Sequence, residues 1–263
     1  MKAFVITDIH SYYGLMTQAL KRVGFEEDNP EHIIINCGDS LDRGPKSYEC
    51  LTFLNKMHQQ GRAYLVKGNH EELLEQLLQG KRSIGSHDFS NGTVKTIRQL
   101  YKSIYGERVK LKDLPDAVNK LNDSKTLSYY LSNLNYYYEF KDYIFVHGWV
   151  PYRAGKADLS YTEGWQRAIW ENGMQDWSYG ITVPDKTIVC GHWHTSWGHT
   201  YLHNVGVAFP EDVYTTYESD PCDHIMHTEP FIDKGIIALD ACTAYSHKVN
   251  VYVIENFEEQ LLC

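Results

Sequence analysis

The stretch that decides the fold is Ile33–Gly44, which reads IIINCGDSLDRG. Its first four residues, Ile33–Asn36, are three isoleucines and an asparagine, and this short run predicts a β-strand. Two glycines, two aspartates and an arginine follow within eight residues of that run. The sequence therefore predicts a strand that delivers polar side chains into the loop at its carboxyl end.

The same arrangement recurs on either side of this stretch. Apolar runs at Ala3–Thr7 and Ala63–Val66 also predict strands. Apolar residues at helical spacing predict helices at Tyr12–Val23 and from Pro45 to about Gln60. Two successive β-α-β units imply a parallel sheet, so the fold class is predicted to be α/β.

The rest of the chain extends this domain. Amphipathic stretches between about residues 80 and 134 predict a helical cap inserted into it. A length of 263 residues and a hydrophobic content of 43% suit one domain with a packed core, so we expect a single domain over residues 1–263. A long loop is expected at 211–223, and further strands are expected at Tyr143–Val146, Thr187–Val189, Ile236–Leu239 and Lys248–Ile254.

Composition excludes several classes of partner. The formal net charge is −9 and no cluster of Lys and Arg follows a phosphate backbone, so no nucleic-acid polymer is expected as partner. No apolar run approaches the ~18 residues that span a bilayer, and no signal-peptide pattern is present. We expect a cytoplasmic protein with no membrane partner. An anionic substrate would need local positive charge, which bound metal ions can supply.

Five predicted strands end in polar residues that can bind metal ions. Carboxyl ends of neighbouring parallel strands meet at one crevice, so these clusters should lie together. Two divalent ions ~3.5–4 Å apart need a bridging carboxylate and mixed oxygen and imidazole ligands. Each cluster alone has an ordinary structural explanation, but five in order favour a metal site. In chain order the clusters are Asp8-Ile9-His10, Gly38–Gly44, Gly68-Asn69-His70-Glu71, His147-Gly148 and Gly191-His192-Trp193-His194.

This series of motifs resembles the calcineurin-like metallophosphoesterases. The forms Asp42-Arg43-Gly44 and Asn69-His70-Glu71 resemble the phosphoprotein phosphatase branch, which includes bacterial and phage serine/threonine phosphatases. The resemblance implies a four-layer α/β/β/α sandwich with a helical insertion and metals at the carboxyl ends of the strands.

The resemblance also implies a role for each motif residue. Asp42 would hold His70, which would act as the leaving-group acid or orient the phosphate. A histidine paired with a carboxylate is a credible proton donor near pH 7. Arg43, Asn69 and His70 would contact the substrate, and the planar fork of Arg43 suits phosphate oxygens. The implied metal ligands are Asp8 and His10 for the first ion, Asn69, His147 and His192 for the second, and Asp39 as the bridge.

The chain departs from the phosphoprotein phosphatase pattern at two points. Its last motif continues to a second histidine, His194, and in the broader superfamily this position binds the first metal. We therefore predict that His194 ligates the first metal, with a hydrogen bond to phosphate or to an outer carboxylate as the alternative. The second phosphate-binding arginine has no matching motif, and Arg153 and Arg167 are its candidates.

The predicted activity is that of a serine/threonine protein phosphatase, in which a hydroxide bridging two metal ions attacks phosphorus and His70 assists the leaving group. Manganese is the preferred ion, with iron or zinc as alternatives. The substrate is expected to be a phosphoprotein or a phosphorylated small molecule. Two alternatives stay open. One is a symmetrical dinucleoside polyphosphate hydrolase acting on diadenosine tetraphosphate, because related enzymes with similar motifs cleave it. The other is a catalytically silent, metal-dependent binding module.

Overall fold

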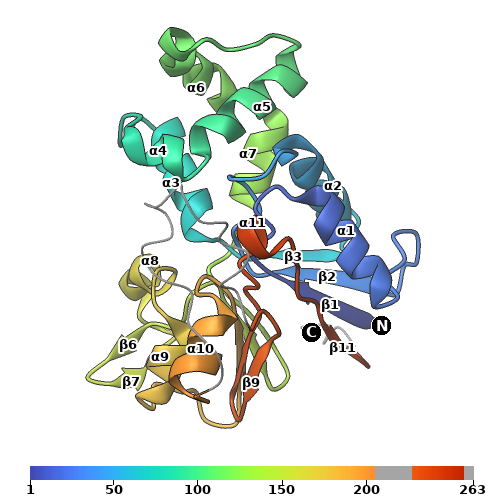
Figure 1. Cartoon of the computed structure of the whole chain (residues 1–263), viewed down its shortest axis with the longest axis vertical. Helices are drawn as coiled ribbons and strands as arrows, with labels where there is room; N and C mark the ends of the chain where they lie inside the picture. Colours follow the sequence, from blue (N-terminus) through green and yellow to red (C-terminus); the bar gives the residue numbers. More distant parts are fainter. Residues whose placement is uncertain (205–226, 258–263) are drawn as a thin grey trace.

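The fold is taken from a computed structural model, which describes residues 1–204 and 227–257 (Figure 1). The loop predicted at 211–223 lies outside these ranges. Within them, no helix combines the length and the apolar character needed to cross a membrane.

The first sheet has four strands in the order β11-β1-β2-β3. Its parallel strands β1, β2 and β3 are joined by helices α1 and α2, so both predicted β-α-β units are present. The added strand β11 pairs antiparallel with β1. The bounds are β1 Lys2–Ile6, α1 Tyr13–Arg22, β2 His32–Asn36, α2 Ser47–Gln59, β3 Ala63–Leu65 and β11 Tyr252–Ile254.

The second sheet has five strands in the order β4-β5-β8-β10-β9. Strands β5, β8 and β10 are parallel, and β4 and β9 pair antiparallel at the two edges. The bounds are β4 Tyr138–Phe140, β5 Tyr143–Phe145, β8 Thr187–Cys190, β9 Phe231–Asp233 and β10 Ile236–Ala238.

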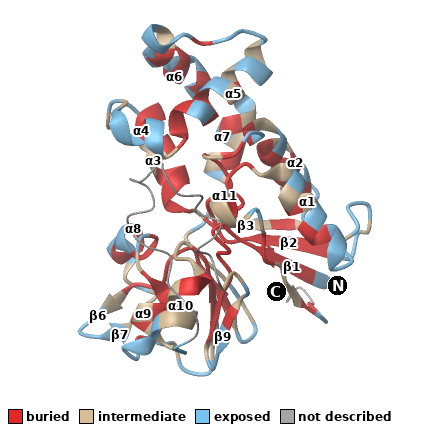
Figure 2. Cartoon of the chain, viewed as in Figure 1, coloured by how far each residue is buried: buried red, intermediate tan, exposed pale blue. Residues whose placement is uncertain are grey.

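The two sheets stack on each other because alternate residues of each strand point to opposite faces. From β1, Ala3 and Val5 enter a core that they share with Phe145 and Val189 of the second sheet. The other face of the first sheet packs against α1 and α2. The outer face of the second sheet packs against a separate core that includes Met174 of α9 (Gly173–Ser178). This order of layers is the predicted α/β/β/α sandwich, and Figure 2 shows the buried residues along both sheets.

Helices occupy the stretch predicted as a cap, and Figure 1 shows α4, α5 and α6 at one end of the molecule. Ile97, Leu100 and Leu121 belong to the same apolar core as the outer face of the first sheet. The division of the chain into one domain with a cap stays a prediction. The bounds are α3 Asn69–Leu78, α4 Ser86–Ser90, α5 Thr93–Tyr105, η1 Leu111–Asp113, α6 Leu114–Asn122 and α7 Lys125–Ser132.

Short elements complete the described chain, and the last strand is shorter than predicted. The side chain of Asn250 donates to the carbonyls of Thr228 (2.6 Å) and Leu239 (2.9 Å). Side-chain hydrogen bonds therefore hold residues 248–251, and β11 begins only at Tyr252. The remaining bounds are β6 Tyr152–Arg153, β7 Lys156–Ala157, η2 Thr162–Gly164, α8 Trp165–Ala168, α10 Thr195–Tyr201 and α11 Thr243–Ser246.

Candidate metal centre

The loops at the carboxyl ends of the parallel strands meet, as their topology predicts. The backbone N–H of Asp8 donates to the carbonyl of Gly38 (3.1 Å), so the loops after β1 and β2 run together. Gly191 donates in the same way to His147 (2.8 Å), which joins the loops after β5 and β8. A bond of 2.8 Å between His147 Nδ1 and the Cys37 carbonyl connects the two sheets.

Several site residues have an unusual backbone conformation. The φ angles are 50° at Asp8, 43° at His10, 52° at Asp39, 71° at Asp42 and 68° at His192. Positive φ is uncommon outside glycine and costs on the order of 1 kcal/mol or more at each residue. Such residues persist where the surroundings hold them and cluster at functional sites.

Two glycines allow the loops to approach closely. A Cβ atom on Gly38 would lie 2.7 Å from His147 Nδ1, and Gly38 also has a φ of +91°. A Cβ atom on Gly191 would lie 2.1 Å from Asp8 Oδ2. Any side chain at either position would push the polar clusters apart.

Asp39 lies at the centre of the cluster. Its Oδ2 atom is 3.8 Å from Nε2 of both His10 and His70, and its Oδ1 atom is 3.4 Å from His147 Nε2. Among the described residues, two groups have ligand atoms close enough to share an ion: His10, Asp39 and His70, and Asp39, His147 and His192. Asp39 is common to both, which is the position predicted for a bridging carboxylate.

Two further predicted ligands lie against these groups. Asn69 Oδ1 is 2.9 Å from His147 Nε2. The Oδ2 atom of Asp8 accepts a hydrogen bond from the backbone N–H of His192 (3.0 Å) and another from the hydroxyl of Thr7. The loops thus bring Asn69 beside His147 of the second group, and Asp8 against the loop that carries His192 and His194.

His194 belongs to neither group. Its Nε2 atom lies 3.8 Å from Asp240 Oδ2, and Asp240 Oδ1 accepts the backbone N–H of Cys242 (2.7 Å). Burial, followed by the nearby carboxylate of Asp8, raises the pKa of Asp240 well above its ordinary value. Direct ligation of the first metal by His194 stays a prediction.

The electrostatics of the cluster suit cations. Burial lowers the pKa of His147, but the carboxylates of Asp39 and Asp8 outweigh burial and raise it to about 10. The pKa values of His10 and His192 are lowered, chiefly by burial, to about 3 for His192. Buried carboxylates here favour positive charge, and neutral imidazoles offer the lone pairs that metals bind. This donor set fits divalent transition ions.

The residues predicted to assist the leaving group, His70, Asp42 and Arg43, also lie together. His70 Nδ1 is 2.8 Å from Asp42 Oδ2, and Arg43 Nη2 is 3.3 Å from His70 Nε2. Burial lowers the pKa of His70, but the carboxylates of Asp39 and Asp42 outweigh it and raise the pKa. The Arg43 guanidinium opposes positive charge at Nε2, whether a metal ion or a proton carries it, so the role of His70 as the acid stays a prediction.

Several supporting residues were not predicted to have a role. The Glu71 carboxylate accepts the backbone N–H groups of Asp39 (2.9 Å) and Ser40 (2.8 Å), and the Tyr130 hydroxyl lies 3.2 Å from Glu71 Oε1. Thr93 donates to Asp42 Oδ2 at 2.7 Å. Glu71 stands in a quoted motif, at the third position of α3 after Gly68, where helices favour an acidic residue. Tyr130 and Thr93 come from the helices of residues 80–134 and carry no local signal.

The two candidates for a second phosphate-binding arginine lie on exposed surface. Arg153 pairs with Asp158, and Arg167 pairs with Glu171. Their side chains are 61% and 73% exposed. Both arginines therefore form ion pairs with neighbouring acidic side chains, and neither is assigned a role in binding phosphate.

Known proteins similar to this chain include proteins named as tetraphosphatases and as serine/threonine-protein phosphatases. The chain is 35% identical over 82 residues to a bis(5′-nucleosyl)-tetraphosphatase PrpE [asymmetrical] of Bacillus velezensis, covering 29% of this chain and 33% of that relative. It is 31% identical over 70 residues to serine/threonine-protein phosphatase 1 of Salmonella typhimurium, covering 27% and 30%. The chain thus spans about a third of the length of these relatives.

The fold is also similar to that of a solved structure. A cold-active protein-tyrosine phosphatase of the psychrophile Shewanella sp. matches 97% of this chain and 75% of its own, with a TM-score of 0.50 and 15% identity. The family model described as calcineurin-like phosphoesterase matches residues 1–220. This match covers most of the chain and all the motif loops, and it shows that the chain belongs to the calcineurin-like phosphoesterase family, whose members hydrolyse phosphoric esters.

Proposed function

We propose that the chain is a two-metal phosphatase that removes phosphate from serine and threonine residues of proteins. The observation that carries the proposal is Asp39, whose Oδ2 atom faces His10 and whose Oδ1 atom faces His147, so that it belongs to both candidate metal groups. When bound, two divalent ions would activate water and neutralise charge on the phosphate. Manganese is the preferred ion, with iron or zinc as alternatives.

The ligands divide between the two sides of Asp39. His10 faces Asp39 Oδ2, and His147 faces Oδ1. We assign the first site to Asp8, His10 and His194, and the second to Asn69, His147 and His192. Hydrogen bonds to backbone carbonyls orient two of these histidines through their outer ring nitrogens. His10 Nδ1 bonds to the Leu41 carbonyl (3.0 Å), and His147 Nδ1 bonds to that of Cys37 (2.8 Å).

The remaining site residues act on the substrate. Arg43 binds phosphate oxygens through its guanidinium fork. His70 carries a proton at Nε2 to the departing alkoxide, while Asp42 fixes the ring through Nδ1 and stabilises the charged imidazolium. A phosphate group between Arg43 and His70 would accept hydrogen bonds from both, in place of their direct contact at 3.3 Å.

A second candidate substrate is a dinucleoside polyphosphate. The Bacillus velezensis relative is named as an asymmetrical bis(5′-nucleosyl)-tetraphosphatase. Trp170 is 42% exposed, and its ring centroid lies 6.1 Å from that of His192. An exposed indole beside the site offers a surface on which a base can stack. The products separate the modes of cleavage, because asymmetrical hydrolysis of diadenosine tetraphosphate yields ATP and AMP, and symmetrical hydrolysis yields two ADP.

A substrate panel tests the proposal. Manganese-loaded protein is assayed with phosphoserine and phosphothreonine peptides, diadenosine tetraphosphate and p-nitrophenyl phosphate, and kcat/KM is compared. We expect the highest value on phosphopeptides. A preference for diadenosine tetraphosphate would establish the second candidate instead, and metal binding without turnover of any substrate would favour a binding module.

The variant His70→Asn provides the matched chemical test. It should retain metal and lose ~10²–10⁴-fold in rate on phosphopeptides, as is typical when a general acid is removed. The loss should be smaller on p-nitrophenyl phosphate, whose leaving group needs no proton. Equal losses on both substrates would contradict the assignment of His70 as the acid.

A further inference from the structure

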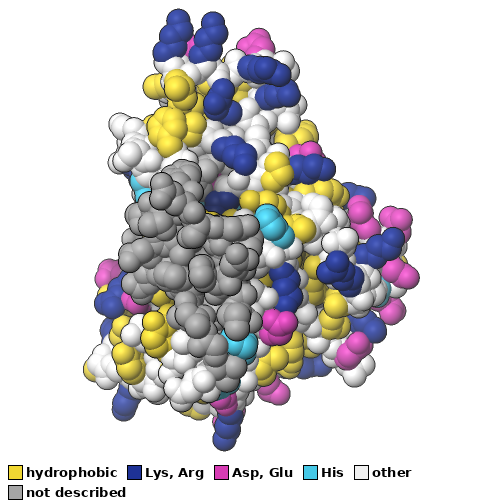
Figure 3. Space-filling view, viewed as in Figure 1, with side chains coloured by type: hydrophobic (Ala, Val, Ile, Leu, Met, Phe, Trp, Pro, Cys, Tyr) yellow, Lys and Arg dark blue, Asp and Glu magenta, His cyan; other side chains and the backbone are white. Residues whose placement is uncertain are grey.

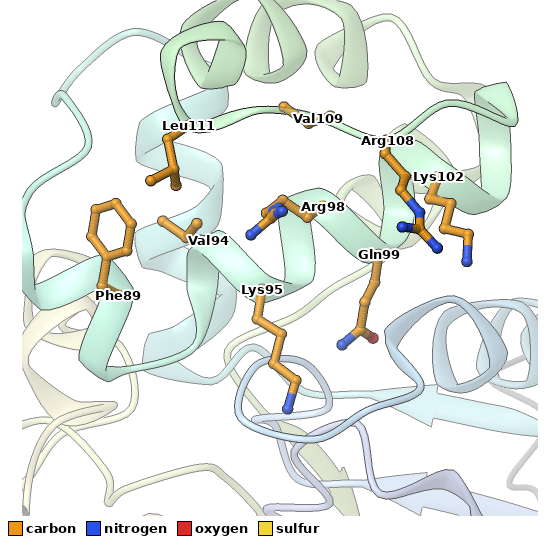
Figure 4. A pocket seen from close by; sticks show the side chains of 9 residues that line it. All are labelled: Phe89, Val94, Lys95, Arg98, Gln99, Lys102, Arg108, Val109 and Leu111. Atoms are coloured by element: carbon orange, nitrogen blue, oxygen red, sulfur yellow. The ribbon is translucent and has the colours of Figure 1, made fainter.

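A hollow of about 590 Å³ lies on the outer face of α5, beside α4 and η1 (Figure 4). Four of the nine residues that line it are cationic, four are apolar and one is Gln99, and Phe89 and Leu111 stand at one end. None of the proposed metal ligands or catalytic residues lines it. The hollow is therefore a separate feature that the reaction chemistry does not explain.

The cations of the hollow form a row. Lys95, Arg98 and Lys102 are three and then four residues apart on α5, so they share one face of the helix. Seven residues of helix place the ends of this row ~10 Å apart. Arg108, from the segment after α5, adds a fourth cation. Figure 3 shows Lys and Arg side chains gathered at this end of the molecule.

This positive charge is uncompensated. No acidic side chain of the described residues lines the hollow. Within residues 1–204 and 227–257, Arg98, Lys102 and Arg108 form no ion pair. The whole chain carries a formal net charge of −9, so the row runs against the overall charge of the protein. An anionic ligand is the complementary partner.

The other end of the hollow is apolar. Phe89 is 53% exposed and Leu111 is 60% exposed, while Val94 and Val109 form a buried apolar floor between them and the cations. Exposed apolar side chains beside a row of charges are typical of a binding surface. The ligand should therefore combine negative charges with an apolar group.

The hollow connects directly to the substrate-binding loop. Lys95 Nζ donates to the backbone carbonyl of Arg43 (2.8 Å), and Gln99 Nε2 donates to that of Gly44 (3.0 Å). A polypeptide with its phosphorylated residue at Arg43 can therefore continue along α5. Three to four extended residues, at ~3.3 Å each, cover the length of the row.

We propose that this hollow binds a segment of the protein substrate next to the phosphorylated residue, one that carries acidic side chains and a large apolar side chain. The inference rests on the proposed phosphoprotein phosphatase function. Acidic side chains two residues apart in an extended peptide recur every ~6.6 Å, which suits a row of cations ~10 Å long. A nucleotide is the competing occupant, with its base on Phe89 and its phosphates on the cations.

Binding tests the hollow without requiring turnover. The probe is a fluorescent, unphosphorylated peptide with four Asp or Glu residues and one Phe, titrated with the full chain at low salt. The double variant Arg98→Ala/Arg108→Ala should weaken binding about tenfold, because exposed ion pairs contribute a few-fold each. Arg22→Ala, at an exposed arginine of α1, is the matched control and should change binding less than twofold. Added salt should weaken binding by the wild type.

Kinetics tests the connection to the active site. Two phosphopeptides that differ only in the acidic and apolar segment are compared. Wild type should favour the peptide with the segment about tenfold in kcat/KM, and the double variant should lose this preference while its turnover of p-nitrophenyl phosphate is unchanged. Equal peptide binding by wild type and double variant would overturn the proposal, and so would displacement of the peptide by ATP at lower concentration than by the unlabelled peptide. If the wild type binds the peptide and turns over no phosphopeptide, the proposed function fails while the binding site stands.

Discussion

Replacing Glu71 with glutamine should loosen the loops that hold the metal ligands. The Glu71 carboxylate is fully buried and accepts backbone hydrogen bonds from two separate loops. Its Oε2 atom accepts from Asp39 (2.9 Å) and Gly68 (3.1 Å), and its Oε1 atom accepts from Ser40 (2.8 Å) and Leu41 (3.4 Å). Glutamine keeps one carbonyl oxygen and has an amide N–H₂ group in place of the other carboxylate oxygen. That group cannot accept hydrogen bonds, so two of the backbone N–H donors would lose their acceptor.

The magnitude follows from these bonds. A hydrogen bond to a charged group contributes ~1.5–3 kcal/mol, so losing two costs ~3–6 kcal/mol. Removing a buried charge offsets part of this loss, because burial and then the charge of Asp39 raise the pKa of Glu71 and so disfavour its ionised form. We expect Glu71→Gln to lower the free energy of unfolding by about 2–4 kcal/mol. Displacement of the Asp39 loop should also weaken manganese binding by ~10–100-fold, the usual effect of losing a supporting contact.

Two measurements check this expectation. Urea denaturation of metal-free protein gives the free energy of unfolding, and isothermal titration calorimetry gives the manganese affinity. Glu72→Gln is the matched control, since Glu72 is also buried and its carboxylate accepts a hydrogen bond from Gln76 of its own helix (3.4 Å). A Glu71→Gln protein with wild-type stability, within about 0.5 kcal/mol, and wild-type manganese affinity would refute the reasoning.

Three further substitutions test other parts of the site and fold. His194→Ala should lower manganese affinity at the first site by more than the ~10–100-fold expected when a residue that only supports a ligand is lost. A manganese-bound crystal structure in which the His194 nitrogens lie well beyond ~2.0–2.3 Å from the ion would contradict direct ligation. Thr93→Val removes the 2.7 Å hydrogen bond to Asp42, so kcat on phosphopeptides should fall about fivefold while kcat on p-nitrophenyl phosphate changes less. An unchanged ratio of the two kcat values would contradict the proposal that Thr93 supports Asp42 and His70. Asp176→Asn tests a buried carboxyl whose pKa is raised from 3.8 to about 6, by burial and then by the charge of Glu171. Because the folded-state pKa lies above the unfolded value, the wild type loses stability as pH rises through 4 to 6, and the variant should be more stable by about 1–2 kcal/mol at pH 8. An equal gain at pH 4, measured by urea denaturation, would be inconsistent with that cause.

The sequence predicts the strands and the loops of the site because both depend on local patterns. The apolar run Ile33–Asn36 predicts β2, which spans His32–Asn36. The carboxyl ends of parallel strands in one sheet must meet, so the order of the motifs predicts that Asp8 and Asp39 lie together. His147 follows β5 of the second sheet, and this rule alone does not place it beside them.

The supporting contacts depend on residues far apart in the chain, so local patterns do not reveal them. Tyr130 lies 90 residues from Ser40, whose hydroxyl it contacts at 2.7 Å. Thr93 lies 51 residues from Asp42. Both come from helices whose amphipathic pattern shows which face is buried and gives no information about its partner. Helix α3 begins at Asn69, which places Asn69 and His70 in its first turn.

The central claim is a pair of metal ions bridged by Asp39, and metal stoichiometry tests it most directly. The protein is saturated with manganese, freed of unbound ions by gel filtration, and measured by elemental analysis. The account predicts two manganese ions per chain for the wild type, and fewer for Asp39→Asn, whose amide cannot bridge the ions as a carboxylate does. One ion per chain in the saturated wild-type protein would contradict the account.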